Sequence, residues 1–287
     1  MTDDPVPGDS ASGKHFYILG DEQVFRSKSP EIFSSIMNMA GVEGTYTPFK
    51  VEPGQIGEAI RKIRSLNTAG ANVTAPFKEA VIPHLDELSE GAIIIGSINT
   101  IVCKGQTLKG YNTNAIGFMD ALKDAGFNAT GKSALVLGTG GVARAVVFIL
   151  KWIQTEQILV AGRSRKNIGT IVNQIGGEAI SLDRLPDRPL PIDLLVNATS
   201  VSAPDAAPEL MELASRLQLP NCKLVIDLNY GHPRNIWQEM ARERGIRFVD
   251  GLTSLANQAR HTFALWTGIE VAPERILGVI RDSATIK

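Results

Sequence analysis

The sequence lacks the charge excess and the long apolar runs that mark several classes of protein. Its 287 residues include 29 basic and 30 acidic side chains, whereas nucleic acids and anionic membranes both select a basic excess. We therefore expect neither partner and favour a small-molecule ligand. No apolar run reaches transmembrane length, and the acidic start "MTDDPVPGDSASGK" has no signal-peptide core. The sequence thus predicts a cytoplasmic protein with a disordered tail over residues 1–13.

Residues that could form a disulfide framework or a metal site are also scarce. The two cysteines, Cys103 and Cys222, lie far apart in the sequence and have no C-x-x-C spacing. The spacing of the four histidines gives no pair of metal ligands. These histidines are His15, His84, His232 and His261. The sequence supports neither a disulfide framework nor a metal site.

What is present is an alternation of short apolar runs with amphipathic segments. The run "HFYIL", for example, precedes "SPEIFSSIMNMAG", and such alternation is typical of βαβ units. In that first helix we expect Ser29 as the N-cap, Pro30 at the first position and Gly41 at the end.

A second alternating series follows a predicted hairpin. The hairpin "NTIVCKGQTLKGYN" turns at Lys104-Gly105, and a helix over about residues 115–125 comes after it. The candidate strands beyond this helix are "SALVLG", "QILVAG", "AISL", "DLLVNA", "LVIDLN" and "IRFVDG". The two series predict an α/β fold of two domains, the second of them a doubly wound parallel sheet. The last helices, "TSLANQARHTFALWTG" and "APERILGVI", belong clearly to neither series.

The strongest local motif is the strand-to-helix turn in "SALVLGTGGVARAVVFIL". Its glycines allow a tight turn and a close backbone approach, so that a pyrophosphate can rest on the helix N-terminus. A merely structural turn is the alternative, but the preceding strand and following helix favour a dinucleotide site. The candidate contacts are Gly138, Gly140, Gly141 and Val142.

A basic turn after the next strand bears on the choice of cofactor. An NAD site would offer an acid there for the ribose hydroxyls, whereas this chain has "LVAGRSRKN". Charge-assisted bonds to a 2′-phosphate are available from Arg163, Ser164, Arg165 and Lys166. A solvated basic turn is the alternative. We expect NADP.

Polar residues stand at the predicted strand ends and in the loops of the first half of the chain. Open α/β sheets bind their ligands at such strand ends. The polar residues are Ser27, Ser29, Asn72, Thr74, Lys78 and Asn99. Neutral amides and hydroxyls suit a polyhydroxylated ring, and the two serines could bind a carboxylate at the helix N-terminus. Individually, Ser29 could be only a cap, the asparagines turn residues, and Lys78 an ordinary helix-start lysine. As a set they favour a site.

Eight motifs in order resemble the shikimate dehydrogenase family, which also contains quinate/shikimate and aminoshikimate dehydrogenases. They are "SKSP", "NVTAPFK", "GSINT", "GYNTNAIGF", "VLGTGGVARA", "GRS", "VNATS" and "DGLTSLANQ". The resemblance runs from His15 to about Ile280. It implies a cleft between a substrate domain, residues 14–113 with 253–287, and a Rossmann NADP-binding domain, residues 114–252.

The resemblance also implies roles for single residues. Lys78 matches the catalytic lysine. The substrate contacts would be Ser27, Ser29, Asn72, Thr74, Asn99, Tyr230 and Gln258. The cofactor contacts would be Gly138, Gly140, Gly141, Val142, Arg163, Ser164, Arg165, Thr199 and Gly251. The chain departs from the family's usual residues at Gly162, Ser164, Asn167 and Ser254.

The largest departure is Asn114, which stands where the family has an aspartate that pairs with the catalytic lysine. The alternative interpretation is that Asn114 caps a helix beginning at Ala115. The sequence leaves open whether the substitution is natural to a subgroup or engineered.

The function implied is reversible, NADPH-dependent reduction of 3-dehydroshikimate to shikimate, with Lys78 as the proton donor. One alternative is a dehydrogenase of a related ring acid, either quinate or aminoshikimate. The other is a weakly active or non-catalytic homologue that binds NADP and a metabolite, because the acid is missing.

Overall fold

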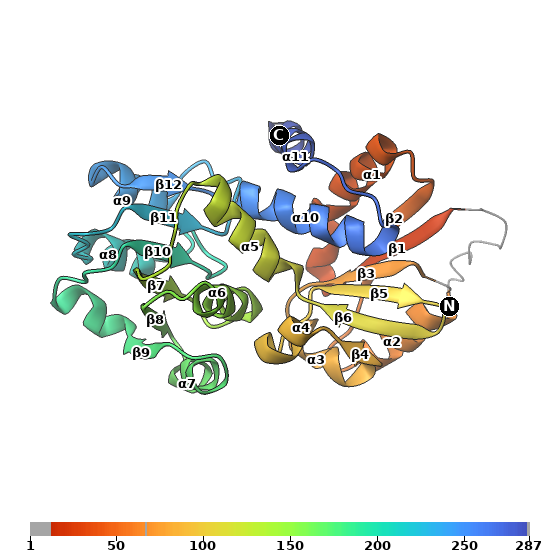
Figure 1. Ribbon diagram of the computed structural model, residues 1–287, viewed down its shortest axis with the longest axis horizontal. Helices are drawn as coiled ribbons and strands as arrows, with labels where there is room; N and C mark the ends of the chain where they lie inside the picture. Colours follow the sequence, from red (N-terminus) through yellow and green to blue (C-terminus); the bar gives the residue numbers. More distant parts are fainter. Residues whose placement is uncertain (1–12, 67, 286–287) are drawn as a thin grey trace.

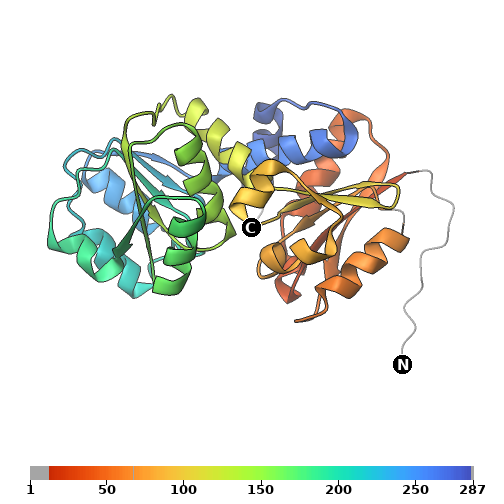
Figure 2. The same ribbon diagram turned by 60° about the horizontal axis from the view of Figure 1, so that its bottom comes forward.

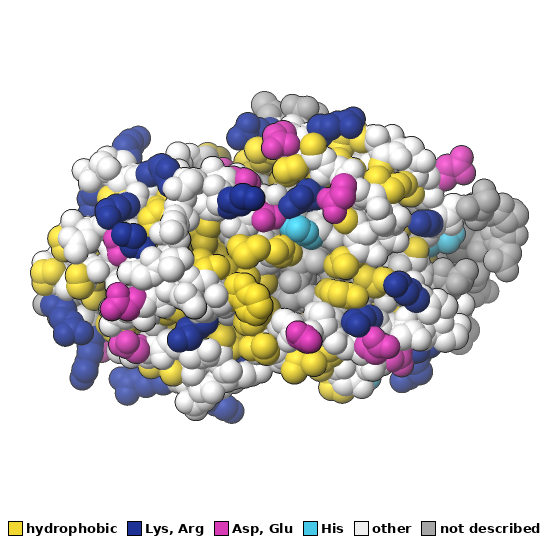
Figure 3. Space-filling view, in the orientation of Figure 1, with side chains coloured by type: hydrophobic (Ala, Val, Ile, Leu, Met, Phe, Trp, Pro, Cys, Tyr) yellow, Lys and Arg dark blue, Asp and Glu magenta, His cyan; other side chains and the backbone are white. Residues whose placement is uncertain are grey.

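The computed structural model describes residues 13–66 and 68–285 and has two α/β domains, each built on a six-stranded sheet (Figure 1). The α/β fold of two domains is confirmed. The tail predicted over residues 1–13 lies, except for Gly13, outside the described residues. Within the described part, no helix has the length and apolar character needed to cross a membrane. Basic and acidic side chains are interspersed over the face drawn in Figure 3.

The first domain contains the sheet with strand order β2-β1-β3-β5-β6-β4. Its strands are β1 (Lys14–Gly20), β2 (Gly44–Lys50), β3 (Gly70–Val73), β4 (Glu87–Leu88), β5 (Thr100–Lys104) and β6 (Thr107–Tyr111). β1 is parallel to β2 and β3, whereas β5 is antiparallel to both of its neighbours. The β5–β6 hairpin turns at Gly105-Gln106, so the turn predicted at Lys104-Gly105 is wrong by one residue. Gly105 has a φ of 58° there, which glycine adopts without strain.

The helices of the first domain begin and end at identifiable signals. They are η1 (Glu22–Arg26), α1 (Ser29–Ala40), α2 (Ile56–Ser65), α3 (Phe77–Ala80), η2 (Ile82–His84) and α4 (Glu90–Ile95). Gly41 ends α1 in the left-handed conformation, as predicted. The prediction that Ser29 is the N-cap is wrong, because Lys28 holds that position and Ser29 is the first helical residue. The Ser29 amide instead donates to Ser27 Oγ at 3.2 Å.

The second domain contains a parallel sheet in the order β12-β11-β10-β7-β8-β9. Its strands are β7 (Ser133–Leu137), β8 (Gln157–Gly162), β9 (Glu178–Ser181), β10 (Leu194–Asn197), β11 (Leu224–Asp227) and β12 (Arg247–Val249). All six predicted strands form. The strand order reverses between β7 and β10, which makes the sheet doubly wound as predicted.

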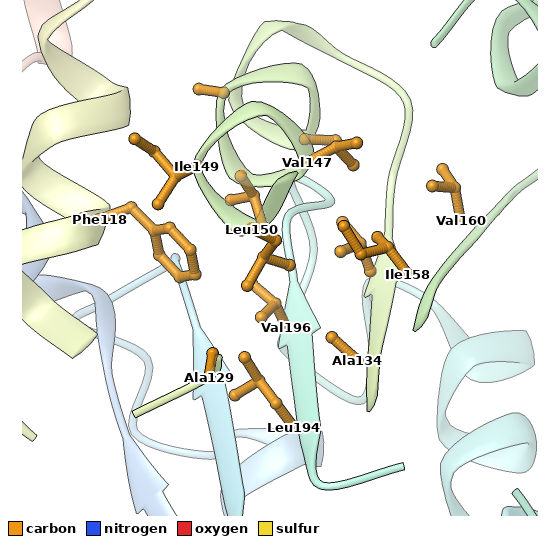
Figure 4. Close-up of a cluster of buried hydrophobic side chains, with 14 of the residues drawn as sticks. Phe118, Ala129, Ala134, Val147, Ile149, Leu150, Ile158, Val160, Leu194 and Val196 are labelled. Atoms are coloured by element: carbon orange, nitrogen blue, oxygen red, sulfur yellow. The ribbon is translucent and has the colours of Figure 1, made fainter. Parts of the chain in front are cut away.

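Helices cover both faces of this second sheet, because alternate strand residues are buried on opposite sides. The helices are α6 (Gly141–Trp152), α7 (Arg165–Gln174), η3 (Leu182–Asp187), α8 (Pro208–Arg216) and α9 (Ile236–Glu243). α6 and α7 pack on one face, and α8 and α9 pack on the other. Figure 4 shows Ile149 of α6 and Phe118 of α5 over Val196 of β10.

The helix α5 (Thr113–Asp124) connects the two domains. Asn112 is its N-cap, and Asn112 Oδ1 accepts from the Ala115 amide at 3.2 Å. The helix therefore starts two residues before the predicted Ala115, and the interpretation of Asn114 as its cap is wrong. The polar side chain of Asn114 needs another explanation.

The helices α10 (Gly251–Thr267) and α11 (Pro273–Thr285) complete the core of the first domain. Trp266 stacks on Phe16 with ring centroids 4.7 Å apart, and its indole N–H donates to the Ile101 carbonyl at 2.9 Å. α10 also packs along α5, as Figures 1 and 2 show. Two adjacent helices thus join the domains, one covering each sheet.

Candidate functional site

A cavity of about 560 Å³ lies where strands of the second sheet end, facing the first domain. The lining includes Gly138, Thr139, Gly140, Gly141, Val142, Arg163, Ser164, Asn167 and Thr199 from the second domain. Ala75 and Lys78 line it from the first domain. The predicted cleft between the domains is therefore present, with the glycine turn on one side and Lys78 on the other.

The glycine turn leaves backbone groups available to a ligand. Gly140 is the N-cap of α6 and provides no side-chain cap, and the first turn of α6 carries no acid. A side chain added at Gly140 would meet nothing within 4 Å. Since the first amides of a helix have no internal partner and sit at the positive end of its dipole, this turn fits a pyrophosphate.

Two neighbouring positions require glycine for different reasons. Gly138 has a φ of 122°, and a Cβ there would lie 2.6 Å from the Ala198 carbonyl oxygen. A Cβ on Gly141 would overlap the hydroxyl of Ser97, which belongs to the first domain. Glycine at position 138 is needed for the tight turn. Glycine at position 141 is needed because the two domains approach each other closely there.

The basic turn contributes unevenly to the cavity. Arg163 is exposed and lines the cavity, whereas Arg165 is exposed but does not line it. Ser164 caps α7, because its Oγ accepts from the Asn167 amide at 3.3 Å. Glu209 brings a carboxylate to the lining, which the sequence did not indicate. Arg163 is the cation best placed for an anionic group.

Thr199 and Gly251 have different surroundings. Thr199 lines the cavity, and its hydroxyl donates to Asn197 Oδ1 at 2.8 Å. Gly251 is buried at the start of α10, where a Cβ would overlap the Leu228 carbonyl oxygen. Gly251 thus permits a close helix-to-strand approach, and Leu228 rather than Gly251 lines the cavity.

Lys78 lies on the short helix α3 and is partly buried against the cavity. Burial of its ammonium group lowers its pKa from 10.5 to about 8. Among the described residues, no hydrogen bond or ion pair to its Nζ is found. A Cβ on Gly141 would lie 3.5 Å from Lys78 Cδ. A lysine that exchanges a proton near neutral pH therefore lies beside the start of α6.

A chain of buried hydrogen bonds runs through the first domain beside this lysine. The Tyr46 hydroxyl is hydrogen-bonded to the Ser29 side chain and donates to Asn72 Oδ1 at 2.7 Å. Asn72 Nδ2 donates to the Asn99 carbonyl at 2.9 Å and to Thr100 Oγ1 at 3.2 Å. Three of the predicted substrate residues are thus held in one network.

The same network continues to α5 and α10. Asn99 Nδ2 donates to Thr113 Oγ1 at 2.8 Å, and the Thr113 amide donates to Asn99 Oδ1 at 2.7 Å. The Thr113 and Thr262 hydroxyls are 2.9 Å apart, and Gln258 Nε2 donates to Thr262 Oγ1 at 3.4 Å. Gln258 is therefore brought to Asn99 although the two are distant in the sequence.

Asn114 sits at the edge of this network with one group unsatisfied. Its Oδ1 accepts from Asn99 Nδ2 at 3.4 Å, whereas its Nδ2 is buried and has no partner among the described residues. A buried donor without an acceptor costs about 1–3 kcal/mol. Asn114 therefore offers a donor to a ligand where an aspartate would offer a charged acceptor.

Three predicted substrate residues lie outside the network. Ser27 Oγ accepts from the Ser29 amide, and Thr74 Oγ1 donates to the Leu19 carbonyl at 3.1 Å. Tyr230 follows β11 and is 36% exposed, and desolvation raises its pKa. Among the described residues, none of the three side chains has a hydrogen bond to the Asn99 group.

Sequence reasoning missed Tyr46, Thr100 and Thr262, which carry the network between the predicted residues. Tyr46 and Thr262 lie within a strand and a helix, where no turn or motif marks them. It also missed Thr139, whose methyl carbon would lie 2.6 Å from a Cβ on Gly162. That contact gives a reason for glycine at position 162.

The doubly wound sheet and uncapped glycine turn of the second domain, together with the first domain that faces them across the cavity, define a two-domain dinucleotide-binding protein. Two family models match the chain, "Shikimate dehydrogenase substrate binding domain" over residues 18–101 and "Shikimate / quinate 5-dehydrogenase" over residues 121–253. A shikimate dehydrogenase (NADP(+)) of Thermus thermophilus is 37% identical over 278 residues, or 92% of this chain and 99% of that protein. The chain belongs to the shikimate dehydrogenase family.

Solved structures agree with this assignment. The crystal structure of a Thermus thermophilus shikimate 5-dehydrogenase, in complex with NADP(H) and shikimate, matches with a TM-score of 0.82 and 32% identity. That match covers 94% of this chain and 99% of the other. The shikimate dehydrogenase of Aquifex aeolicus matches with a TM-score of 0.84 and 30% identity, over 95% and 99% of the two chains.

Proposed function

We propose that this protein catalyses the reversible, NADPH-dependent reduction of 3-dehydroshikimate to shikimate. The observation that carries the proposal is that Lys78, with its pKa lowered to about 8, lines the same cavity as the glycine turn. A proton donor and a dinucleotide site thereby meet at one place, which reduction of a ketone requires. The named activity of the Thermus relative supports the same reaction.

The second domain, residues 114–252, would hold the cofactor. Amides at the start of α6 bind the pyrophosphate, and the exposed Arg163 pairs with the 2′-phosphate. Further contacts come from Gly138, Gly140, Gly141, Val142, Ser164 and Thr199, which line the cavity. Arg165 and Gly251 do not line it, and their cofactor contacts stay predictions from the resemblance. NADPH, when bound, supplies the hydride. We expect a cytoplasmic enzyme, because NADPH and a metabolite of biosynthesis would be its cofactor and substrate.

The first domain, residues 14–113 with 253–287, would hold the ring acid. Ser27 and Ser29 bind its carboxylate beside the start of α1, and Tyr230 reaches it from the other domain. The ring hydroxyls contact Asn72, Thr74, Asn99, Asn114 and Gln258. Most of these side chains already have hydrogen-bond partners that fix their orientation, so the site is preorganised.

Lys78 would move the proton. Its ammonium donates to the carbonyl oxygen as the alcohol forms, and its neutral amine accepts the proton in the reverse reaction. Because its pKa is about 8, reduction should weaken as the pH rises through that value, and oxidation should strengthen.

Turnover of purified protein tests the proposal. Shikimate, quinate and an amino-substituted shikimate are each assayed with NADP+ and with NAD+, following nicotinamide absorbance. We expect the highest kcat/KM for shikimate with NADP+. A preference for quinate or aminoshikimate would assign the protein to another branch of the family. Tight binding of NADPH and shikimate without turnover on any acid would favour a binding role, for which Asn114 is the specific argument.

A further inference from the structure

We propose that Arg144 is a positioning residue that fixes the separation between the start of α6 and the segment holding Lys78 and Asn99. This inference rests on the proposed function, because the two sides of the cleft would hold the two reactants. Arg144 lies on α6, three residues after Gly141, and is only 6% exposed. Its guanidinium reaches across to the first domain.

The contact is made to the last carbonyls of α4. Arg144 Nε donates to the Ile95 carbonyl at 2.5 Å, and Arg144 Nη2 donates to Gln174 Oε1. Gln174, at the end of α7, donates from its Nε2 to the Ile94 carbonyl at 3.1 Å. Two side chains of the second domain thus bond two successive carbonyls at the end of one helix of the first domain, and α4 and α6 lie side by side.

Charge and shape both favour this arrangement. The last carbonyls of a helix lack internal partners and carry the negative end of its dipole, so a buried cation satisfies and stabilises them. Gly96 ends α4 with a φ of 63°, and a Cβ there would lie 2.6 Å from Arg144 Nη2. The backbone can therefore come close enough for the guanidinium to bond it.

The segment that follows α4 transmits this contact to the site. Ser97 is fully buried against Gly141, and its hydroxyl has no hydrogen-bond partner among the described residues. The Ile98 amide donates to the Lys78 carbonyl at 2.7 Å, and Asn99 follows directly. Holding residues 94–96 against α6 therefore holds Lys78 and Asn99 at a set distance from the glycine turn.

Hydride transfer makes that distance matter. The ring and the nicotinamide would be held by different domains, and a misplacement of about 1 Å can lower a rate about a hundredfold. Loosening the contact should impair the transfer step more than the binding of either reactant. Arg144 would thus act on the rate without touching a reactant.

Arg244 provides a matched control. Its Nη2 donates to the Ala214 and Ser215 carbonyls at 2.9 and 3.0 Å, near the end of α8. Arg244 therefore caps a helix as Arg144 does, but inside the second domain and away from the cavity lining given above. Arg144→Met and Arg244→Met remove the same groups and differ in whether the contact crosses between domains.

The experiment compares steady-state kinetics of full-length parent and variants. For Arg144→Met we expect kcat to fall about ten- to a hundredfold, with KM for shikimate and for NADP+ each within about threefold of the parent. The primary isotope effect with deuterated substrate should rise, because hydride transfer becomes more rate-limiting. Arg244→Met should lower thermal stability but leave kcat and the isotope effect unchanged.

Two milder variants keep the test decisive if Arg144→Met does not fold. Arg144→Lys keeps a cation that can bond one carbonyl, and Gln174→Ala removes the second contact at an exposed position. Both should give intermediate kcat values and raised isotope effects. Lower thermal stability with unchanged kcat and isotope effect in these variants overturns the proposal.

Hydrogen exchange separates this inference from the proposed function. In the Arg144 variants, amide exchange should rise both in residues 96–99 and in the first turn of α6, and in Arg244→Met it should rise in neither. If the parent turns over no ring acid, the proposed reaction fails, and the exchange result alone decides the role of Arg144. Unchanged exchange in both segments overturns that role.

Discussion

The two sides of the cleft differ in whether backbone or side-chain groups form them. The cofactor side consists mainly of backbone, namely a glycine turn and the uncapped start of α6. The exposed side chain of Arg163 adds a cation to it. The substrate side consists of buried side chains that hydrogen-bond one another across β2, β3, β5, α5 and α10. The first is open to a ligand, whereas the second is largely satisfied before a ligand arrives.

This difference decides how mutations should act. An exposed side chain on the cofactor side can be removed with little effect on folding, because nothing buried depends on it. Removing a member of the substrate-side network leaves buried partners unsatisfied, at about 1–3 kcal/mol each. Stability and activity should therefore be separable on the cofactor side and coupled on the substrate side. Lys78 and Asn114 are exceptions, because Lys78 Nζ and Asn114 Nδ2 have no partner among the described residues, and so is Gln258, whose bond is long.

The largest effect is expected for Lys78→Met. Turnover should fall about 10²- to 10⁴-fold through loss of the proton donor. The variant should nevertheless be more stable near pH 7, by about 1–3 kcal/mol, since no ammonium is buried. Kinetic assays and denaturant unfolding measure the two quantities, with Lys104→Met, at an exposed position, as the control.

The pH dependence of stability gives an independent check of Lys78. Its folded pKa of about 8 lies below the ordinary 10.5, so the unfolded chain binds more protons between these values. The parent should therefore gain stability as the pH rises from about 8 to 10.5, and Lys78→Met should lack that contribution. Equal pH dependence in both proteins would contradict the lowered pKa.

The second effect is on cofactor choice. Arg163→Ala should reduce the preference for NADPH over NADH about ten- to a hundredfold, because a charge-assisted contact contributes about 1.5–3 kcal/mol. Stability should stay within about 0.5 kcal/mol of the parent, as Arg163 is exposed. Arg165→Ala is the comparison, since it tests whether the neighbouring cation also contributes. A parent that uses NADH equally well would refute the phosphate-binding role of this turn.

The strand, glycine turn and helix of the cofactor side could be predicted from the sequence, because such backbone structure is encoded locally. The glycine spacing, the apolar strand before it and the helix after it all lie within "SALVLGTGGVARAVVFIL". The six strands of the second sheet could also be predicted from the sequence, since each is a short apolar run between turn residues. Helix starts were harder to predict. The N-caps expected at Ser29 and Asn114 are instead Lys28, one residue earlier, and Asn112, two residues earlier.

The substrate side depends on contacts that no local pattern encodes. Thr262 bonds Thr100 and Thr113 across 162 and 149 residues of sequence, and a threonine inside a helix carries no signal of such a partner. The resemblance to a family supplied Asn99 and Gln258 but not the threonines between them. The orphaned amide of Asn114 likewise becomes visible only once Asn112 is seen to cap α5.

The third effect concerns Asn114. In Asn114→Asp a carboxylate beside Lys78 would favour the ammonium form and raise the lysine pKa by about one unit or more. Ketone reduction, which weakens above about pH 8 in the parent, should then persist to higher pH, and oxidation should need a higher pH. Turnover should rise about tenfold or more. Since Asn112 caps the helix, unchanged turnover and pH profile would leave Asn114 with no role toward Lys78.

The smallest effect is expected for Gln258→Ala, at the far end of the substrate-side network. Gln258 donates to Thr262 by a long bond of 3.4 Å, so its loss costs the fold little, while a neutral hydrogen bond to the ring acid contributes about 0.5–1.5 kcal/mol. KM for shikimate should rise about two- to twelvefold, with kcat and KM for NADP+ nearly unchanged. Gln238→Ala, an exposed glutamine on α9, is the control and should change neither KM. A rise in KM for NADP+ as large as that for shikimate would show that the two sides of the cleft are not independent at this position, and the division between a backbone-built cofactor side and a side-chain-built substrate side would fail there.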